Sequence, residues 1–265
     1  MLTNDLLLKA YGLMCTSRAM ADMYENNRQT CKYVHSTSKG HEAIQLATAF
    51  HLAPYDYVSP YYRDESMLLG LGFMPLQLML QLLAKGTDEF TGGREYYSHP
   101  NNKGNNKPTI IHQSSATGMQ VIPTTGIAQG IQYKEKMFSL NQHSEVVSTP
   151  QLAPVVICSL GDASVTEGEV SEAFQFAALH QLPIIYLVQD NGWGISVTAE
   201  EARTTNANEM VKGFKGIKRI SIDGSDFLQS YEVMKNVIDE VRKERHPFLV
   251  HARVPLLGHH TSGVR

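Results

Sequence analysis

Cysteine, net charge and long apolar runs are all scarce in this 265-residue sequence. Its three cysteines, Cys15, Cys31 and Cys158, are widely spaced and form no metal or redox motif, which argues against a disulfide framework and suits a reducing compartment. The net charge of −3 gives no reason to expect nucleic acid or an anionic membrane as a partner. No apolar run approaches the length of a membrane span, and residues 1–9 lack the layout of a signal peptide. We therefore expect a cytoplasmic protein that binds neither nucleic acid nor membrane.

The composition that remains is that of an ordinary globular domain. Hydrophobic residues make up 42% of the chain and charged residues 18%. This length can hold one α/β domain with a sizeable core. Because we find no internal repeat, linker or low-complexity segment, we predict a single domain over residues 1–265.

Residues 153–196 carry the strongest pattern. The apolar run Val155–Leu160 has the length and β-branched content of a buried strand, and it stops at Gly161–Ala163. Thr166 and Glu169 then have the spacing of a capping box, which predicts the start of a helix. A second apolar run, 184–188, follows that helix. The pattern predicts a strand, a helix and a second strand parallel to the first, joined by a right-handed crossover.

The polar residues of this unit follow its two predicted strands. Asp162 and Asn191 each come just after a strand, so both should lie at the same edge of a parallel sheet, where open α/β sheets bind ligands. A carboxylate, an amide oxygen and a nearby backbone carbonyl suit an octahedral Mg²⁺ that keeps places for phosphate oxygens and water. Amides at the helix start near Thr166 would face the same anion. The sequence therefore predicts a site for a metal diphosphate.

Gly161-Asp162-Ala163, with Asn191 following 29 residues after Asp162 (191 − 162), resembles the thiamine diphosphate motif, in which Ala163 replaces a glycine. The resemblance is strongest to the α subunit of the decarboxylating component of 2-oxo acid dehydrogenase complexes, especially the branched-chain type. It runs from about residue 36 to the end of the chain. It implies the thiamine diphosphate-binding fold, an α/β fold with a mostly parallel sheet flanked by helices.

The resemblance also implies a set of site residues. Tyr62 and Arg63 would contact the diphosphate, for which a guanidinium gives a planar bidentate fork. His260 would lie beside the diphosphate and the reacting carbon as the catalytic residue, with a charge state that changes near physiological pH. The expected metal ligands are Asp162, Asn191 and the carbonyl of Trp193. The full set of cofactor-binding residues is Tyr62, Arg63, Ser115, Thr117, Gly161, Asp162, Ala163, Ser164, Asn191, Trp193 and His260.

Four further positions were interpreted individually. Gln189 stands where branched-chain relatives carry a phosphate-binding arginine, so we expect Arg63 and His260 to carry more of the diphosphate charge. His41, before a predicted helix, is interpreted as a surface or capping residue. His99, in a long predicted loop over residues 86–107, is a candidate near the substrate. His259 and His260 are not expected to share one ion, because adjacent residues in extended chain point to opposite faces.

The resemblance implies the α half of a 2-oxo acid dehydrogenase, which binds Mg²⁺ and thiamine diphosphate, decarboxylates a branched-chain 2-oxo acid oxidatively and passes the acyl group to a lipoyl group. In the family a β subunit supplies a necessary glutamate, so the expected assembly is α₂β₂ with a lipoyl-bearing acyltransferase as a further partner. Because the chain ends inside an expected active-site loop, we interpret it as truncated at its C-terminus or as the first half of an α–β fusion.

Three alternatives stay open. One is the α subunit of a pyruvate or acetoin dehydrogenase. Another is a cofactor-binding assembly module without turnover of its own. The third is a phosphotransferase that uses Asp162 as a nucleophile; it needs a basic residue close to Asp162, and the neighbouring sequence offers none.

Overall fold

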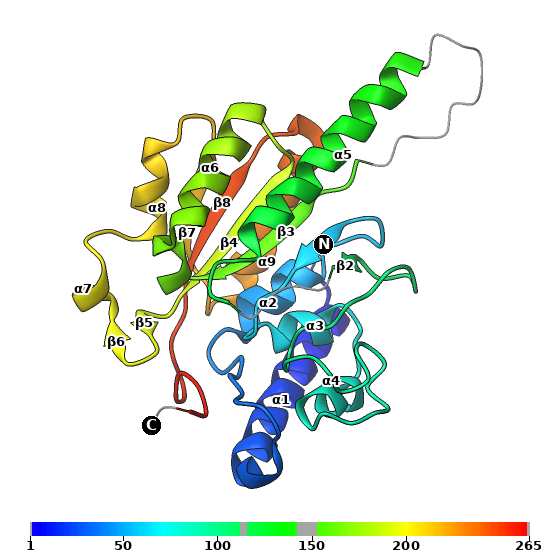
Figure 1. Ribbon diagram of the computed structural model, residues 1–265, viewed down its shortest axis with the longest axis vertical. Coiled ribbons are helices and arrows are strands. Elements are labelled where there is room, and N and C mark those ends of the chain that lie inside the picture. The colour runs from blue at the N-terminus through cyan, green and yellow to red at the C-terminus, as the bar shows by residue number, and fades with distance from the viewer. Residues whose placement is uncertain (1, 112–115, 142–152, 264–265) are drawn as a thin grey trace.

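The computed structural model describes residues 2–111, 116–141 and 153–263. In this part of the chain, six strands form one parallel sheet in the order β2-β1-β3-β4-β8-β7 (Figure 1). The strands are β1 (Tyr57–Ser59), β2 (Thr109–Ile110), β3 (Val156–Gly161), β4 (Ile184–Asp190), β7 (Lys218–Asp223) and β8 (Phe248–Arg253). A separate antiparallel pair consists of β5 (Trp193–Gly194) and β6 (Val197–Thr198).

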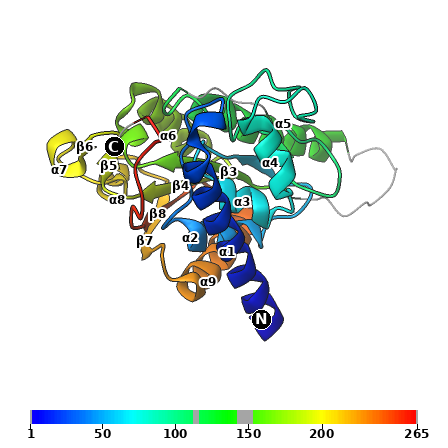
Figure 2. The same ribbon diagram turned by 90° about the horizontal axis from the view of Figure 1, so that it is seen from below.

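Helices cover both faces of the sheet (Figures 1 and 2). One face carries α5 (Val121–Asn141), α6 (Gly168–His180) and α8 (Ala207–Met210). The other carries α1 (Asn4–Asn26), α2 (Glu42–Ala49), α3 (Glu65–Gly70), α4 (Pro75–Leu82) and α9 (Phe227–Glu244). The short α7 (Ala199–Ala202) and the 3-10 turns η1 (Arg28–Thr30), η2 (Ala163–Thr166) and η3 (Val211–Gly213) complete the described elements. Among these helices, none combines the length and apolar character that a membrane crossing requires.

Strict alternation along the central strands divides the core into two layers. Ile157 of β3 and Leu187 of β4 pack into the core beneath α9, whereas Cys158 and Tyr186 pack into the core beneath α6. All four side chains are fully buried. Because successive side chains of a strand point to opposite faces, a strand covered by helices on both faces must be apolar throughout. This is why the two apolar runs of the sequence predict β3 and β4 correctly, and the parallel unit that joins them is confirmed.

The start of α6 differs from the prediction. Thr166 ends the tight turn η2, and its hydroxyl donates to the carbonyl of Ala163 at 2.8 Å. Glu167 is extended (φ −68°, ψ 142°) and forms the N-cap without a side-chain hydrogen bond, so α6 begins at Gly168. The predicted capping box of Thr166 and Glu169 is therefore wrong, because the hydroxyl that it needs is used inside the preceding turn.

One acidic side chain lies deep in the layer beneath α1. Glu65, at the start of α3, is fully buried and accepts hydrogen bonds on Oε2 from the hydroxyls of Tyr24 and Tyr97. Its Oε1 has no partner in the described part of the chain. Burial raises the pKa of Glu65 to about 7, against which the two tyrosine hydrogen bonds act. Glu65 thus links α1, α3 and the segment around residue 97 through hydrogen bonds, and its ionised form is disfavoured by burial.

This pKa predicts how the free energy of unfolding depends on pH. The folded chain keeps the Glu65 proton up to about pH 7, whereas the unfolded chain releases it near the ordinary glutamate pKa of 4.5. The free energy of unfolding should therefore fall as pH rises from 4.5 to 7, by about 3 kcal/mol. Glu65→Gln, which has no proton to lose, should flatten this part of the profile, measured by urea unfolding at a series of pH values. Glu172→Gln, on the exposed face of α6, is the control. A parent-like slope in Glu65→Gln would contradict the assignment.

Candidate active site

A cleft opens where β1, β3 and β4 end and where the C-terminal segment crosses the sheet edge. Of the eleven site residues expected from the sequence, ten line this cleft: Tyr62, Arg63, Thr117, Gly161, Asp162, Ala163, Ser164, Asn191, Trp193 and His260. The eleventh, Ser115, lies outside the described residues. His99 also lines the cleft. The fold thus brings the expected residues together, and their individual roles stay predictions.

A buried guanidinium forms one side of the cleft. Arg63 is 1% exposed. It donates through Nη2 to the carbonyl of His260 at 2.8 Å and through Nη1 to the carbonyl of Thr37 at 3.3 Å. Among the described residues, no carboxylate lies within ion-pair distance of it. A buried cation is costly unless it is paired, so this side of the cleft fits an anion.

His260 lies beside this cation with one ring nitrogen free. Its Nδ1 has no hydrogen-bond partner among the described residues. Burial and the charge of Arg63 lower the pKa of His260 to about 4, so the ring is neutral at pH 7. The expectation of a change in charge near physiological pH therefore does not hold for the unliganded chain. An anion in the cleft would raise the pKa, because it would offset the charge of Arg63.

On the opposite side of the cleft the lining residue Asp162 is paired with Arg203 and lies next to Asp190, and these two residues stand behind the lining. Arg203, which follows α7, donates through Nη2 to Asp162 Oδ2 at 2.5 Å and to Asp190 Oδ1 at 3.0 Å. Burial and the neighbouring Asp190 raise the pKa of Asp162 to about 6. Burial also opposes ionisation of Asp190, but hydrogen bonds from His251 and Asp162 and the charge of Arg203 outweigh it and lower that pKa to about 2. The described neighbourhood offers one guanidinium for two carboxylates, which leaves room for another cation.

Arg203 also corrects the argument against a phosphotransferase. The sequence near Asp162 offers no basic residue, yet the fold brings Arg203 onto it across 41 positions of the chain. That alternative therefore cannot be set aside for lack of a basic group.

A chain of hydrogen bonds holds Asn191 in place. Gln189 is fully buried and donates to Asp64 Oδ1 at 2.7 Å and to Ser159 Oγ at 2.9 Å. Its amide nitrogen is thereby fixed, so its Oε1 accepts from His41 Nδ1 at 2.9 Å. His41 Nε2 is then the unprotonated nitrogen and accepts from Asn191 Nδ2 at 3.3 Å. The Asn191 oxygen is left on the other side, where it accepts from the backbone amide of Trp193 at 3.0 Å.

This chain corrects the expectation for His41 and shows where the Gln189 side chain lies. His41 occupies the N-cap position of α2 without a capping bond, but it is fully buried, and burial together with Arg63 lowers its pKa to about 3. Gln189 does not line the cleft, because its side chain turns into the interior beneath α2. An arginine placed at position 189 would put a second cation close to Arg63, and the expectation that Gln189 marks a lost phosphate contact stays a prediction.

The C-terminal segment reaches the cleft through a close backbone contact. Gly40 has φ +94°, and a Cβ on it would lie 1.9 Å from the carbonyl oxygen of Pro255. Only glycine takes this conformation and permits this approach. The segment that carries His260 is therefore held against the turn that carries His41.

The residues of the cleft fit a metal diphosphate. Arg63 and His260 lie on the side that fits an anion, and Asp162, the amide oxygen of Asn191 and the Trp193 carbonyl are oxygen donors of the kind that Mg²⁺ takes. Comparison with known proteins identifies the family of the chain. The family described as "Dehydrogenase E1 component" matches residues 11–263. The chain belongs to the dehydrogenase E1 component family.

Its relatives within the E1 family share 27–29% identity with it. They include 2-oxoisovalerate dehydrogenase subunit alpha 2, mitochondrial, of Arabidopsis thaliana, 27% identical over 263 residues, which are 98% of this chain and 51% of that protein. The Bacillus subtilis subunit alpha is 29% identical over 264 residues, 98% of this chain and 74% of that protein. The human mitochondrial 2-oxoisovalerate dehydrogenase subunit alpha is 28% identical over 263 residues, which are 98% of this chain and 54% of that protein. The chain spans about half the length of the plant and animal relatives. The resemblance to branched-chain α subunits is confirmed.

A solved structure supports the fold of this E1 family chain. Transketolase from Campylobacter jejuni superposes with a TM-score of 0.64 over 96% of this chain and 38% of that one, at 18% identity. The predicted fold class, a thiamine diphosphate-binding α/β fold with a parallel sheet flanked by helices, is confirmed.

The raised pKa of Asp162 predicts a gain in stability when its charge is removed. In the unliganded chain, ionised Asp162 is buried next to Asp190, and the folded chain resists that charge up to about pH 6. Asp162→Asn keeps an oxygen for Arg203 and removes the charge. We expect the free energy of unfolding at pH 8 to rise by roughly 1–3 kcal/mol. At pH 5 the gain should be smaller, because the folded parent is then protonated at Asp162.

Chemical unfolding at the two pH values measures this gain. Asp5→Asn, exposed in the first turn of α1, is the matched control and should change little. A loss of stability at pH 8 in Asp162→Asn would show that Arg203 fully compensates both carboxylates.

Proposed function

We propose that this chain is the α-type half of a 2-oxo acid dehydrogenase, binding thiamine diphosphate with Mg²⁺ in the cleft for the oxidative decarboxylation of branched-chain 2-oxo acids. One observation carries the proposal. Arg63, a buried arginine with no carboxylate partner among the described residues, and Asp162, a buried carboxylate, line one cleft in a chain that the E1 family matches over residues 11–263. The names of the relatives support the choice of substrate class.

Each side of the cleft then has a binding task. Arg63, Tyr62 and His260 hold the diphosphate, and the backbone of Gly161–Ser164 approaches it. Asp162, the Asn191 oxygen and the Trp193 carbonyl ligate Mg²⁺. The hydrogen-bond chain through Gln189 and His41 keeps the Asn191 amide from turning over. Thr117, with Ser115, contacts the aminopyrimidine ring.

The bound cofactor would supply the nucleophile for the carbonyl carbon and the electron sink for decarboxylation. The residues of this chain supply position and proton control. His260 lines the cleft with a neutral ring, so it can exchange a proton or hydrogen bond with a group there. Burial of Arg63 and Asp162 keeps water away from the charges that they hold.

A second chain is part of the proposal. The described lining of the cleft contains no glutamate, whereas the resemblance requires one at the aminopyrimidine. We infer that a β subunit, or a fused β half, supplies it in an α₂β₂ assembly, and that a lipoyl-bearing acyltransferase accepts the product. Without that partner the chain would bind the cofactor but not turn over. The expected cytoplasmic location stays a prediction.

Turnover of a substrate panel tests the function. The chain and its β partner, with Mg²⁺, thiamine diphosphate and a dye as electron acceptor, should decarboxylate branched-chain 2-oxo acids faster than pyruvate. The chain alone should be inactive, and Asp162→Asn, which is expected to fold stably, is the matched inactive variant. Faster turnover of pyruvate would favour the alternative pyruvate dehydrogenase. Activity of the isolated chain would show that the site is complete without a partner.

Binding of the cofactor tests Arg63. A charge-assisted hydrogen bond contributes about 1.5–3 kcal/mol, and about 1.4 kcal/mol corresponds to a tenfold change in affinity. Arg63→Lys, which keeps the charge and loses the fork, should weaken binding of thiamine diphosphate to the αβ complex by roughly tenfold, measured by calorimetry at saturating Mg²⁺. Arg219→Lys, on the exposed edge strand β7, is the control. An unchanged affinity in a folded Arg63→Lys would return Arg63 to a structural role.

A further inference from the structure

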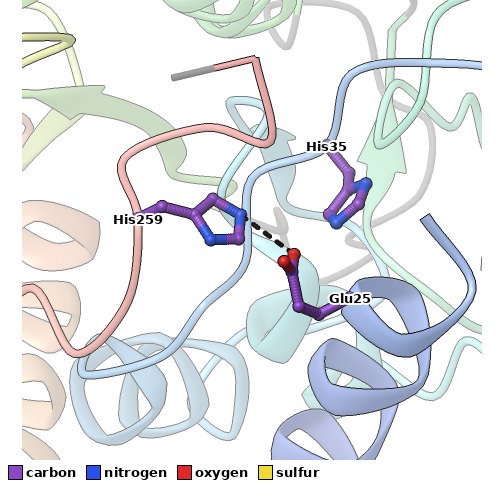
Figure 3. Close-up of side chains that lie close together, drawn as sticks. All are labelled: Glu25, His35 and His259. Carbon is purple, nitrogen blue, oxygen red and sulfur yellow. Dashed lines mark ion pairs between the residues drawn. The ribbon is translucent and has the colours of Figure 1, made fainter. Parts of the chain in front are cut away.

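We propose that Glu25, His35 and His259 form a second metal site, for a divalent transition ion of the zinc type, outside the cleft. Figure 3 shows the three side chains converging from three segments of the chain. Glu25 comes from the last turn of α1, His35 from the segment after η1, and His259 from the segment after β8. One potential ligand atom from each side chain lies within 4.8 Å of the other two.

The segments are held together independently of any ion. The backbone amide of His35 donates to Ser262 Oγ at 2.9 Å, and the amide of Ser262 donates to the carbonyl of His35 at 2.8 Å. The ring of His35 packs edge-on against Tyr24, with centroids 5.6 Å apart, and against His259 at 6.1 Å. The two histidines are therefore positioned by the fold, as the ligands of a metal site must be.

The ring nitrogens of His35 are buried and unsatisfied within the described residues. Its side chain is buried, with 1% of the residue exposed, and neither ring nitrogen has a hydrogen bond within the described residues. In the described part of the chain, Nε2 of His259 has no hydrogen bond, and it faces Glu25 Oε2 at 3.7 Å. Leaving a buried polar atom unsatisfied destabilises the folded chain, so such atoms call for an explanation. A metal ion between the three side chains would satisfy one nitrogen of each ring.

The donor set selects the kind of ion. Two imidazole nitrogens and one carboxylate suit Zn²⁺ and its neighbours, whereas Mg²⁺ and Ca²⁺ take oxygen ligands. Ligands of a tetrahedral ion lie roughly 3.3 Å apart at bond lengths of about 2 Å, so the cluster must contract. Glu25, at the exposed end of α1, can make that movement.

This site is separate from the cleft but shares a segment with it. His260 lines the cleft, whereas His259, the preceding residue, turns to the opposite side of the segment toward Glu25. An ion held by His259 would therefore fix the segment on the side away from the cleft. It would also fix the position of the His260 carbonyl, which accepts a hydrogen bond from Arg63. The role that follows is structural: the ion clamps the C-terminal segment onto α1.

Positive charges beside the cluster set its strength. Arg28 pairs with Glu25 Oε1 at 3.3 Å, and the charges of Arg28 and Lys39 both act on His259. They oppose a second cation. Removing the Arg28 charge should therefore strengthen metal binding, whereas removing a ligand should weaken it. An ion bound adventitiously elsewhere on the chain would show neither of these two opposite changes in affinity.

The test is Zn²⁺ binding to the chain after removal of metals with EDTA, without Mg²⁺ or thiamine diphosphate. Calorimetry should detect one Zn²⁺ per chain, and excess Mg²⁺ should not displace it. Glu25→Gln, a change at an exposed position, should weaken binding tenfold or more, His35→Gln should weaken it further, and Arg28→Gln should strengthen it severalfold. Glu172→Gln and His180→Gln, both on the exposed face of α6, are the controls and should bind like the parent. Co²⁺ should give a visible spectrum that Glu25→Gln alters.

Two results would overturn the proposal. One is the absence of Zn²⁺ binding to the folded parent chain. The other is binding that Glu25→Gln and His35→Gln leave unchanged while both variants melt as cooperatively as the parent. Asp162→Asn should leave Zn²⁺ binding intact, so failure of the proposed cofactor site and failure of this site are distinguishable.

Discussion

Parallel pairing of β3 with β4 is the constraint on which the cleft depends. The register places Gly161 opposite Gln189, so the residues that follow both strands emerge at one edge of the sheet. The pairing itself rests on apolar side chains buried on both faces. Asp162 and Asp190 are adjacent because the backbone ladder puts them there, against their mutual repulsion. The stability of the sheet thus holds in place an arrangement of charges that is unfavourable by itself.

The buried charges at the cleft are likewise unfavourable for folding, but they are suited to binding a charged ligand. Arg63 is buried with backbone carbonyls as its partners, and Arg203 is shared between two carboxylates. Neither arrangement maximises the stability of the unliganded chain. Both leave charge that a ligand of opposite sign can neutralise, so part of the free energy spent in burying these groups is recovered on binding. A cleft of this kind is selective for a ligand that carries both signs of charge.

Features of the fold and the site that depend on neighbouring residues could be predicted from the sequence, whereas those that depend on contacts between distant residues could not. The two central strands, the sheet edge and the residues around Asp162 follow from apolar runs and local spacing. Arg203 could not be found in this way, because no pattern links it to Asp162 before the chain folds. The burial of His41 depends on Gln189 beneath it, which is equally a tertiary contact. The capping box failed for a local reason, since a 3-10 turn used the Thr166 hydroxyl first.

The contact between Gly40 and the Pro255 carbonyl limits how this sequence can change. Two segments more than two hundred positions apart meet where one of them has no side chain at all. A single methyl group at position 40 would push away the segment that carries both His259 and His260, and no rotamer could relieve it, because the obstacle is backbone. Any descendant of this sequence that acquires alanine at position 40 must therefore have rerouted its C-terminal segment first, and the two segments can diverge only together.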